Sequence, residues 1–275
     1  MNCAWKELLS ILPPWISQEV DRVGKDHAQE IRLRLGAVPE IVCWPESIWL
    51  KGIVGKDELN FCVNTASRYS PWTAQSAAMG YITGPGGHRI GICGDAVMKD
   101  GQMTGIRCIT SVCIRIARDY PDIAEDAAGL QGSILIIGPP GSGKTTLLRD
   151  LVRKISVREH IAVVDERGEL FPEHFIYGSR IDVLKCCGKR HGIDAVLRSM
   201  GPGCIAVDEI TAKEDCEALT MAGWCGVRLL ATAHAGSVRD LERRPLYRPI
   251  LASGLFDHIL VLRKDKSWRE ERLYG

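Results

Sequence analysis

The chain has 275 residues, of which 45% are hydrophobic and 25% charged, as in a globular protein with enough apolar side chains for one large domain or two modest ones. Its 35 Lys and Arg residues nearly balance its 34 Asp and Glu residues, so no global field attracts nucleic acid or an anionic membrane. The eleven cysteines form no C-x-x-C pair, which argues against a structural zinc site. The cysteines that we expect to be small buried side chains in a reducing compartment include Cys62, Cys93, Cys113 and Cys204.

The N-terminal segment "MNCAWKELLSILPPW" has one short apolar run and no small-residue cleavage site, so we do not expect a signal peptide. No segment approaches the roughly 18 uncharged apolar residues of a membrane helix. We therefore expect a cytoplasmic protein without a covalent membrane anchor, which reaches a membrane only as a peripheral component held by partners.

The first 120 residues mix short strands and helices. Residues 30–36 alternate apolar and charged side chains and predict a half-buried strand, and 39–44 and 47–54 predict further strands. Residues 64–80 open with a possible Asn64 cap and close on Gly80, which predicts a helix. Residues 88–118 predict a β-meander with a hairpin turn at Asp100-Gly101. We expect a small α+β domain over residues 1–122.

Residues 118–132 are acidic and punctuated by proline and glycine, and we place the domain boundary there. Beyond this boundary, short apolar strands alternate with helices. The predicted strands span 133–137, 161–165, 204–208, 227–232 and 258–264. Continuously apolar strands separated by helices are typical of a parallel sheet covered on both faces. The predicted fold class is therefore α/β for residues 123–275.

The segment "GPPGSGKTT" lies between a predicted strand and a predicted helix, the context that a phosphate-binding P-loop requires. Backbone N–H groups of such a loop and the positive end of the helix dipole bind phosphate. Lys144 should reach the β- and γ-phosphates of ATP, and Thr145 should bind Mg²⁺. The predicted nucleotide-binding residues are Gly138, Pro139, Pro140, Gly141, Ser142, Gly143, Lys144, Thr145 and Thr146.

Two predicted strands end in an Asp-Glu pair, and the metal could be held at either. In one large class of P-loop ATPases, a further strand separates the P-loop strand from the metal strand, and a glutamate directly follows the metal aspartate. "CIAVDEI" fits this order, which assigns Asp208 to Mg²⁺ and Glu209 to the catalytic base. "IAVVDERGE" comes directly after the P-loop helix in the chain, and its Glu169 is the alternative base. Its first two acids could instead cap the turn that follows.

The strand over 227–232 leads to His234, which could bind the γ-phosphate as a neutral imidazole and report its loss. The alternative is a structural histidine, because a lone histidine is more often structural than functional.

A P-loop, a "DERGE" acidic box, a D-E metal strand and a "TAHA" histidine box occur here in this order. In this combination the sequence resembles the secretion ATPases of type II, type IV and pilus-motor systems, and in particular a branch that acts in sporulation. The likeness extends into the first domain through "EIRLRLGAVPEI", "GYITGPGGHRIGICGDAV" and "IRIAR". It implies a RecA-like ATPase domain that forms hexameric rings and binds ATP and Mg²⁺.

The resemblance also implies that a neighbouring subunit can complete the site and that first-domain arginines neutralise phosphate charge. Arg89 and Arg107 stand nearest those positions, and ordinary surface arginines are the alternative. Two features depart from the family: the four-cysteine zinc element is absent, and Asp208-Glu209 replaces the Gly-Glu of many relatives. We therefore expect no metal other than Mg²⁺, while the division of roles among the acids stays open.

The resemblance implies a motor that hydrolyses ATP and energises the assembly of, or transport through, a sporulation channel, with membrane proteins of that channel or of a secretion apparatus as partners. The alternative is an ATP-dependent single-stranded nucleic-acid translocase, and a small-molecule phosphotransferase is a third possibility. A translocase should show a basic groove with interleaved aromatic residues. The balanced charge argues against one, as does the apolar setting of five first-domain tryptophans. We expect packing to account for these, namely Trp5, Trp15, Trp44, Trp49 and Trp72.

Overall fold

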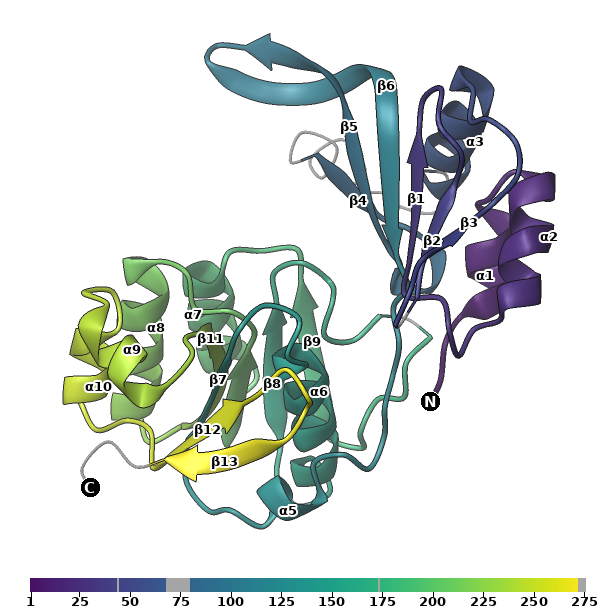
Figure 1. The fold of residues 1–275 in the computed structure, drawn as a ribbon. Coiled ribbons are helices and arrows are strands. Elements are labelled where there is room, and N and C mark those ends of the chain that lie inside the picture. The colour runs from purple at the N-terminus through teal and green to yellow at the C-terminus, as the bar shows by residue number, and fades with distance from the viewer. Residues whose placement is uncertain (44, 68–79, 173, 272–275) are drawn as a thin grey trace. The chain divides into compact units, whose positions relative to one another are not determined.

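The computed structural model describes residues 1–43, 45–67, 80–172 and 174–271, and the chain folds into two compact units (Figure 1). The first unit comprises Met1–Asp119 together with Pro172–His174, and the second comprises Tyr120–Phe171 and Phe175–Gly275. The units thus divide after Asp119, where we expected a boundary after residue 122. The sequence did not predict that Pro172–His174 would belong to the first unit.

The first unit is an antiparallel sheet with helices packed on it. Its strands are β1 (Glu30–Arg34), β2 (Glu40–Val42), β3 (Ile48–Trp49), β4 (Tyr81–Thr83), β5 (Arg89–Lys99) and β6 (Gln102–Arg115), in the spatial order β3-β2-β1-β6-β5-β4. Its helices are α1 (Trp5–Ser10), α2 (Pro14–Val23), α3 (Lys56–Ser67) and the short 3-10 helix η1 (Pro85–Gly87). In β1, Ile31 and Leu33 are fully buried while their neighbours are partly exposed, which confirms the predicted half-buried strand.

Residues 89–115, within the segment predicted as a meander, form one long β5–β6 hairpin, which confirms the predicted turn at Asp100-Gly101 (Figure 1). Asp100 and Gly101 join the two strands with φ angles of 51° and 76°, and these two positive values are those of a type I′ turn. A type I′ turn matches the right-handed twist of the strands that it connects.

The predicted Asn64 cap was wrong: residues 64–67 are helical, but they continue a helix that begins at Lys56, and Asn64 lies in its interior. The remainder of the predicted helix, residues 68–79, lies outside the described part of the chain. Asp57 and Glu58 occupy the first turn, and a Glu58 carboxylate oxygen accepts a hydrogen bond from the Gly55 N–H at 2.9 Å. An acidic first turn of this kind stabilises a helix start, and it marks the true beginning of α3.

The second unit is built on one sheet with the order β13-β12-β7-β11-β10-β8-β9. Its strands are β7 (Ile134–Gly138), β8 (Ile161–Asp165), β9 (Ile181–Lys185), β10 (Cys204–Val207), β11 (Arg228–His234), β12 (His258–Leu262) and β13 (Trp268–Glu271). All neighbouring strands are parallel except β12 and β13, which confirms the mainly parallel sheet. The sheet also contains two strands that we did not predict, β9 and β13, and both lie at its edges.

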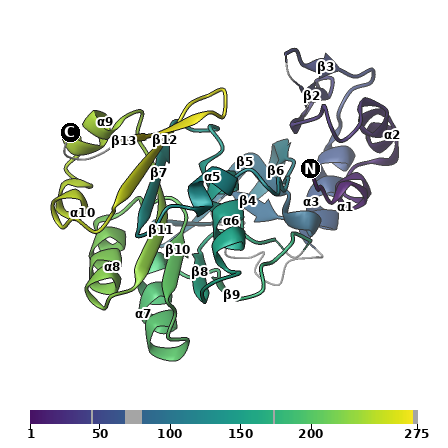
Figure 2. The same cartoon turned by 90° about the horizontal axis from the view of Figure 1, so that it is seen from below.

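Helices cover both faces of this sheet, as its continuously apolar strands require (Figure 2). Ile134 and Ile136 of β7 pack with α5 (Glu125–Ala128) and α6 (Lys144–Ile155). Leu135 and Ile137 belong to the core on the opposite face. The helices on that face are α7 (Lys189–Ser199), α8 (Lys213–Trp224), α9 (Val238–Arg243) and α10 (Arg248–Ala252).

Two side-chain predictions need correction. Cys93 is exposed in β5, whereas Cys62 and Cys204 are buried as expected and Cys113 is partly buried. Trp49 is 58% exposed on the edge strand β3, so packing does not account for it. Trp44 and Trp72 lie outside the described residues. Within the described part of the chain, every helix is too short or too polar to cross a membrane.

Candidate nucleotide-binding site

The P-loop connects the end of β7 at Gly138 to the start of α6 at Lys144. Gly141 and Gly143 adopt φ angles of 73° and 97°, a backbone conformation that residues other than glycine rarely adopt. A methyl group at Gly138 would lie 2.6 Å from Ser142 Oγ and 2.8 Å from the Leu262 carbonyl oxygen. The three glycines are therefore needed for this loop conformation, which places the N-terminus of α6 at the carboxyl edge of the sheet.

The residues of this loop fit a phosphate group. The hydroxyl of Ser142 is buried and has no hydrogen-bond partner in the structure, although buried polar atoms are nearly always paired. This orphaned donor lies in a loop that leads directly into a helix N-terminus, where backbone N–H groups and the helix dipole favour anions. A phosphate oxygen would satisfy the Ser142 hydroxyl.

Lys144 is 6% exposed, and its ammonium group bonds within the site. It donates to the carbonyl oxygens of Gly138 and Pro139, each at 3.0 Å, and lies 3.0 Å from His234 Nδ1. Burial lowers the pKa of Lys144, while the carboxylates of Asp208 and Glu209 act in the opposite direction. The three contacts account for all three N–H bonds, so binding of a phosphate by Lys144 requires one of them to break.

Asp208 is held by two hydroxyl groups. Thr145 Oγ1 donates to Asp208 Oδ2 at 2.7 Å, and Thr232 Oγ1 donates to Asp208 Oδ1 at 2.5 Å. Mg²⁺ prefers oxygen ligands and often uses only one or two protein groups, with water and phosphates completing its octahedron. A threonine hydroxyl beside a carboxylate is a donor set of this kind, so Thr145 and Asp208 fit the metal predicted for this site.

Glu209 follows Asp208 and is held on both carboxylate oxygens. Its Oε1 lies 2.8 Å from His234 Nε2, and its Oε2 lies 2.5 Å from Arg167 Nη1. Its backbone adopts a φ of 57° in the left-handed region, and its N–H donates to Thr232 Oγ1 at 2.7 Å. Because a non-glycine residue rarely takes this conformation, the surrounding contacts must impose it.

The contacts of His234 define its tautomer. The Lys144 ammonium can only donate, so His234 Nδ1 must accept and its proton must lie on Nε2. Nε2 therefore donates to Glu209. His234 ends β11 and pairs with Gly138 in the register of the sheet, and this places the imidazole directly beside the P-loop. The histidine thus links the proposed phosphate-binding lysine to the proposed base.

The carboxylates of the acidic box are engaged locally. Asp165 is 2% exposed, and its two oxygens accept the N–H groups of Glu169, Leu170 and Phe171 at 2.9–3.1 Å. Burial raises the pKa of the Asp165 carboxyl, and the three N–H donors act in the opposite direction. The structure therefore supports the expectation that Asp165 caps the turn after β8, while the role of Glu169 as alternative base stays a prediction.

Two basic residues contact this site although the sequence analysis did not single them out. Arg167 reaches Glu209, and Lys266, in the turn between β12 and β13, donates to the Gly141 carbonyl oxygen of the P-loop. Lys266 was missed because β13 itself was missed. The presence of Arg167 inside the acidic box was the available signal for its role.

Arg89 and Arg107 lie in the first unit, on β5 and β6. The guanidinium of Arg89 stacks 4.1 Å from the centre of the Tyr81 ring, and Arg107 pairs with Asp95 in the hairpin register. These contacts are compatible with ordinary strand arginines, and the phosphate-neutralising role of both residues stays a prediction.

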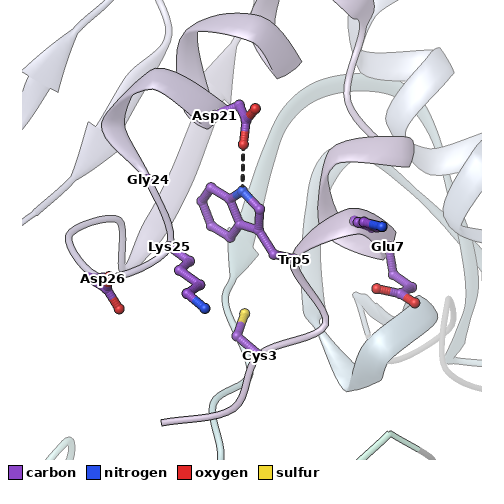
Figure 3. Close-up of a pocket in the computed structure, with 8 residues that line it drawn as sticks. Cys3, Trp5, Glu7, Asp21, Gly24, Lys25 and Asp26 are labelled. Atoms are coloured by element: carbon purple, nitrogen blue, oxygen red, sulfur yellow. Dashed lines mark hydrogen bonds between the residues drawn. The ribbon is translucent and has the colours of Figure 1, made fainter.

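An open pocket of about 610 Å³ lies elsewhere in the first unit (Figure 3). Trp5 donates to Asp21 at 2.7 Å there, and Lys6, Glu7 and Lys25 also line it. Its acids and bases are mixed, and it contains none of the residues that the sequence assigns to nucleotide binding.

The family model "Sporulation stage III, protein AA" matches residues 7–272. Stage III sporulation protein AA of Bacillus subtilis is 34% identical, over 94% of this chain and 91% of that protein. SEEDLING PLASTID DEVELOPMENT 1 of Arabidopsis thaliana is 27% identical, over 90% of this chain and 36% of that protein.

Among solved structures, the ATPase DotB of Legionella pneumophila superposes with a TM-score of 0.61 at 16% identity, over 94% of this chain and 79% of DotB. The pilus retraction motor PilT with bound ADP superposes with a TM-score of 0.61 at 18% identity, over 90% of this chain and 77% of PilT. The fold is therefore that of the secretion ATPases. Since the family model spans nearly the whole sequence, this chain belongs to the sporulation stage III protein AA family.

Proposed function

We propose that the protein hydrolyses ATP to ADP and phosphate with Mg²⁺, and that it does so as a hexameric motor. In this proposal the motor energises the assembly of, or transport through, a sporulation membrane channel. The observation that supports it best is the cluster at the P-loop, where His234 contacts both Lys144 and Glu209 and Thr145 bonds to Asp208. The membership of the sporulation family and the fold shared with the ATPase DotB and the motor PilT point in the same direction.

Each residue has a distinct role in this reaction. Lys144 gives up its contact with His234 and binds the β- and γ-phosphates, with the Ser142 hydroxyl and the P-loop N–H groups around it. Thr145 and Asp208 would hold Mg²⁺, and the bound ion would supply positive charge that neutralises developing phosphate charge. Glu209 accepts the proton of the attacking water. His234 keeps Glu209 oriented through the Nε2–H donor. Its Nδ1 atom loses the hydrogen bond from Lys144 when the lysine turns to the phosphates.

Steady-state ATP hydrolysis by purified variants tests this assignment. Lys144→Ala should abolish turnover because the phosphate clamp is lost. Glu209→Gln should bind ATP normally and turn over at least ~100-fold more slowly, the usual scale for the loss of a general base. Glu214→Gln, an exposed acid in the first turn of α8, is the matched control and should behave as wild type.

Two results would contradict the assignment. Absence of ATP hydrolysis by the wild-type protein at any Mg²⁺ concentration would refute the ATPase itself. Normal hydrolysis by Glu209→Gln together with loss in Glu169→Gln would move the base to the acidic box and leave Asp208 as the metal residue.

A further inference from the structure

The segment Asp165–Phe171, called the acidic loop below, lies at the end of β8, and β10 separates β8 from β11 and the P-loop strand β7. Its first carboxylate forms an internal cap: Asp165 is buried and accepts three N–H groups of the loop itself. A turn closed by three hydrogen bonds to one carboxylate has a defined backbone course, so the residues between its ends are held in place.

The acidic loop is also tied to its surroundings. Glu166 forms an ion pair with Lys189 of α7, and the Lys189 side chain is only 4% exposed. Lys189 Nζ also lies 3.8 Å from Oδ2 of Asp215, the residue that caps the start of α8. On the other side, Arg149 of the P-loop helix α6 donates to the carbonyl oxygens of Glu169 and Leu170. The loop is thus fixed to α6, α7 and, through Lys189, the start of α8.

Arg167 lies between these anchors, and its guanidinium contacts Glu209 Oε2 at 2.5 Å. The opposite oxygen of Glu209 is contacted by His234 Nε2 at 2.8 Å. Because each carboxylate oxygen of Glu209 accepts a hydrogen bond from a different side chain, the orientation of the carboxylate plane is fixed. The arginine side chain is 42% exposed, so the contact is not required for core packing.

We propose that Arg167 is a positioning residue for Glu209, and that the acidic loop serves to present it. This inference rests on the proposed ATPase function. General-base catalysis needs the accepting oxygen within hydrogen-bond reach of the attacking water, and misplacement by about 1 Å can cost ~100-fold in rate. Without Arg167, His234 is the one side chain among the described residues that still hydrogen-bonds to the Glu209 carboxylate, which sits on a left-handed backbone.

Arg167→Gln should lower kcat for ATP hydrolysis by about 10- to 100-fold, while the KM for ATP changes by less than about threefold. Arg167→Lys keeps the positive charge and should recover part of the loss. Arg190→Gln is the matched control: Arg190 is an exposed arginine of α7 that lies 4.0 Å from its acidic partner Glu217, and its loss should leave both constants unchanged.

A double-mutant cycle distinguishes positioning of Glu209 from any other role of Arg167. In the Glu209→Gln background, measured in single turnovers with labelled ATP, the further change Arg167→Gln should cost less than about twofold. An equal loss in both backgrounds would show that Arg167 does not act through Glu209 and would overturn the inference.

Other outcomes separate this inference from the proposed function. If the wild-type protein hydrolyses ATP and Arg167→Gln keeps its kcat, the positioning role is refuted while the ATPase stands. If the wild-type protein does not hydrolyse ATP, the proposed function fails and the inference fails with it. A change in KM alone would assign Arg167 to nucleotide binding and likewise overturn the positioning role.

Discussion

Thr232 shows how one buried hydroxyl can organise two acidic residues. It is fully buried in β11, its Oγ1 donates to Asp208 Oδ1, and the same oxygen accepts the N–H of Glu209. A hydroxyl provides one donor and two acceptor lone pairs, so a single threonine can serve both partners. Strand β11 thus fixes the side chain of Asp208, the proposed metal ligand, together with the left-handed backbone of Glu209, the proposed base.

Thr232→Val keeps the shape of the side chain and removes both hydrogen bonds. Because the Glu209 N–H and one oxygen of Asp208 lose their partner, the free energy of unfolding should fall by about 1–3 kcal/mol. Chemical denaturation measures this loss, and kcat should fall with it. Thr232→Ser retains the hydroxyl and is the control; equal stability of the valine and serine variants would contradict the prediction.

At the level of elements, His88 joins three segments of the first unit. It is fully buried between η1 and β5; its Nδ1 accepts the Ala117 N–H at 3.0 Å and its Nε2 contacts the Ala4 carbonyl oxygen at 2.9 Å. Both contacts require a neutral imidazole with its proton on Nε2. Burial lowers the pKa of His88 below the ordinary value of 6.5, although the Ala4 carbonyl acts in the opposite direction.

This shift predicts how stability depends on pH. Since the folded-state pKa lies below that of the unfolded chain, the unfolded chain binds more protons between the two values, and stability falls as pH drops below about 6.5. Urea denaturation at pH 7.5 and pH 5.5 should show this loss. His88→Gln should be less stable at pH 7.5 and should lose less on acidification, while His27→Gln, an exposed histidine of the same unit, should follow wild type.

At the scale of the whole molecule, the proposed hexameric ring means that ATP hydrolysis depends on assembly of the subunits. If a neighbouring subunit completes each site, the active fraction depends on association, and mass action makes it depend on protein concentration. The family resemblance also assigns Arg89 and Arg107 to phosphate, and that assignment stays a prediction.

The ATPase rate per chain should therefore climb steeply across a wide range of protein concentration, and single-stranded DNA should not change it. A Lys144→Ala sample at each concentration provides the background. A rate that is independent of concentration and stimulated several-fold by DNA would contradict the ring motor and support the nucleic-acid translocase.

The elements that could be predicted are those whose signal is local. Buried strands such as β7 and β8 are continuously apolar, and the P-loop has both its glycines and its flanking strand and helix in one short segment. The edge strands β9 and β13 carried no such signal: β13 reads WREE, and only its backbone pairing with β12 makes it a strand. Arg167 could not be placed because its partner Glu209 lies 42 residues away.

The sequence by itself determined the P-loop, the fold class and the set of candidate acids, because glycine positions, hydrophobic periodicity and side-chain chemistry are properties of short segments. The residues alone left two Asp-Glu pairs at the ends of buried strands, and the choice of Asp208 came from the strand order of one class of P-loop ATPases. Tertiary structure decided this by sheet order: β11 lies between β7 and β10, and β8 lies beyond them. Asp208 therefore meets Thr145, whereas Asp165 is left to cap its own turn.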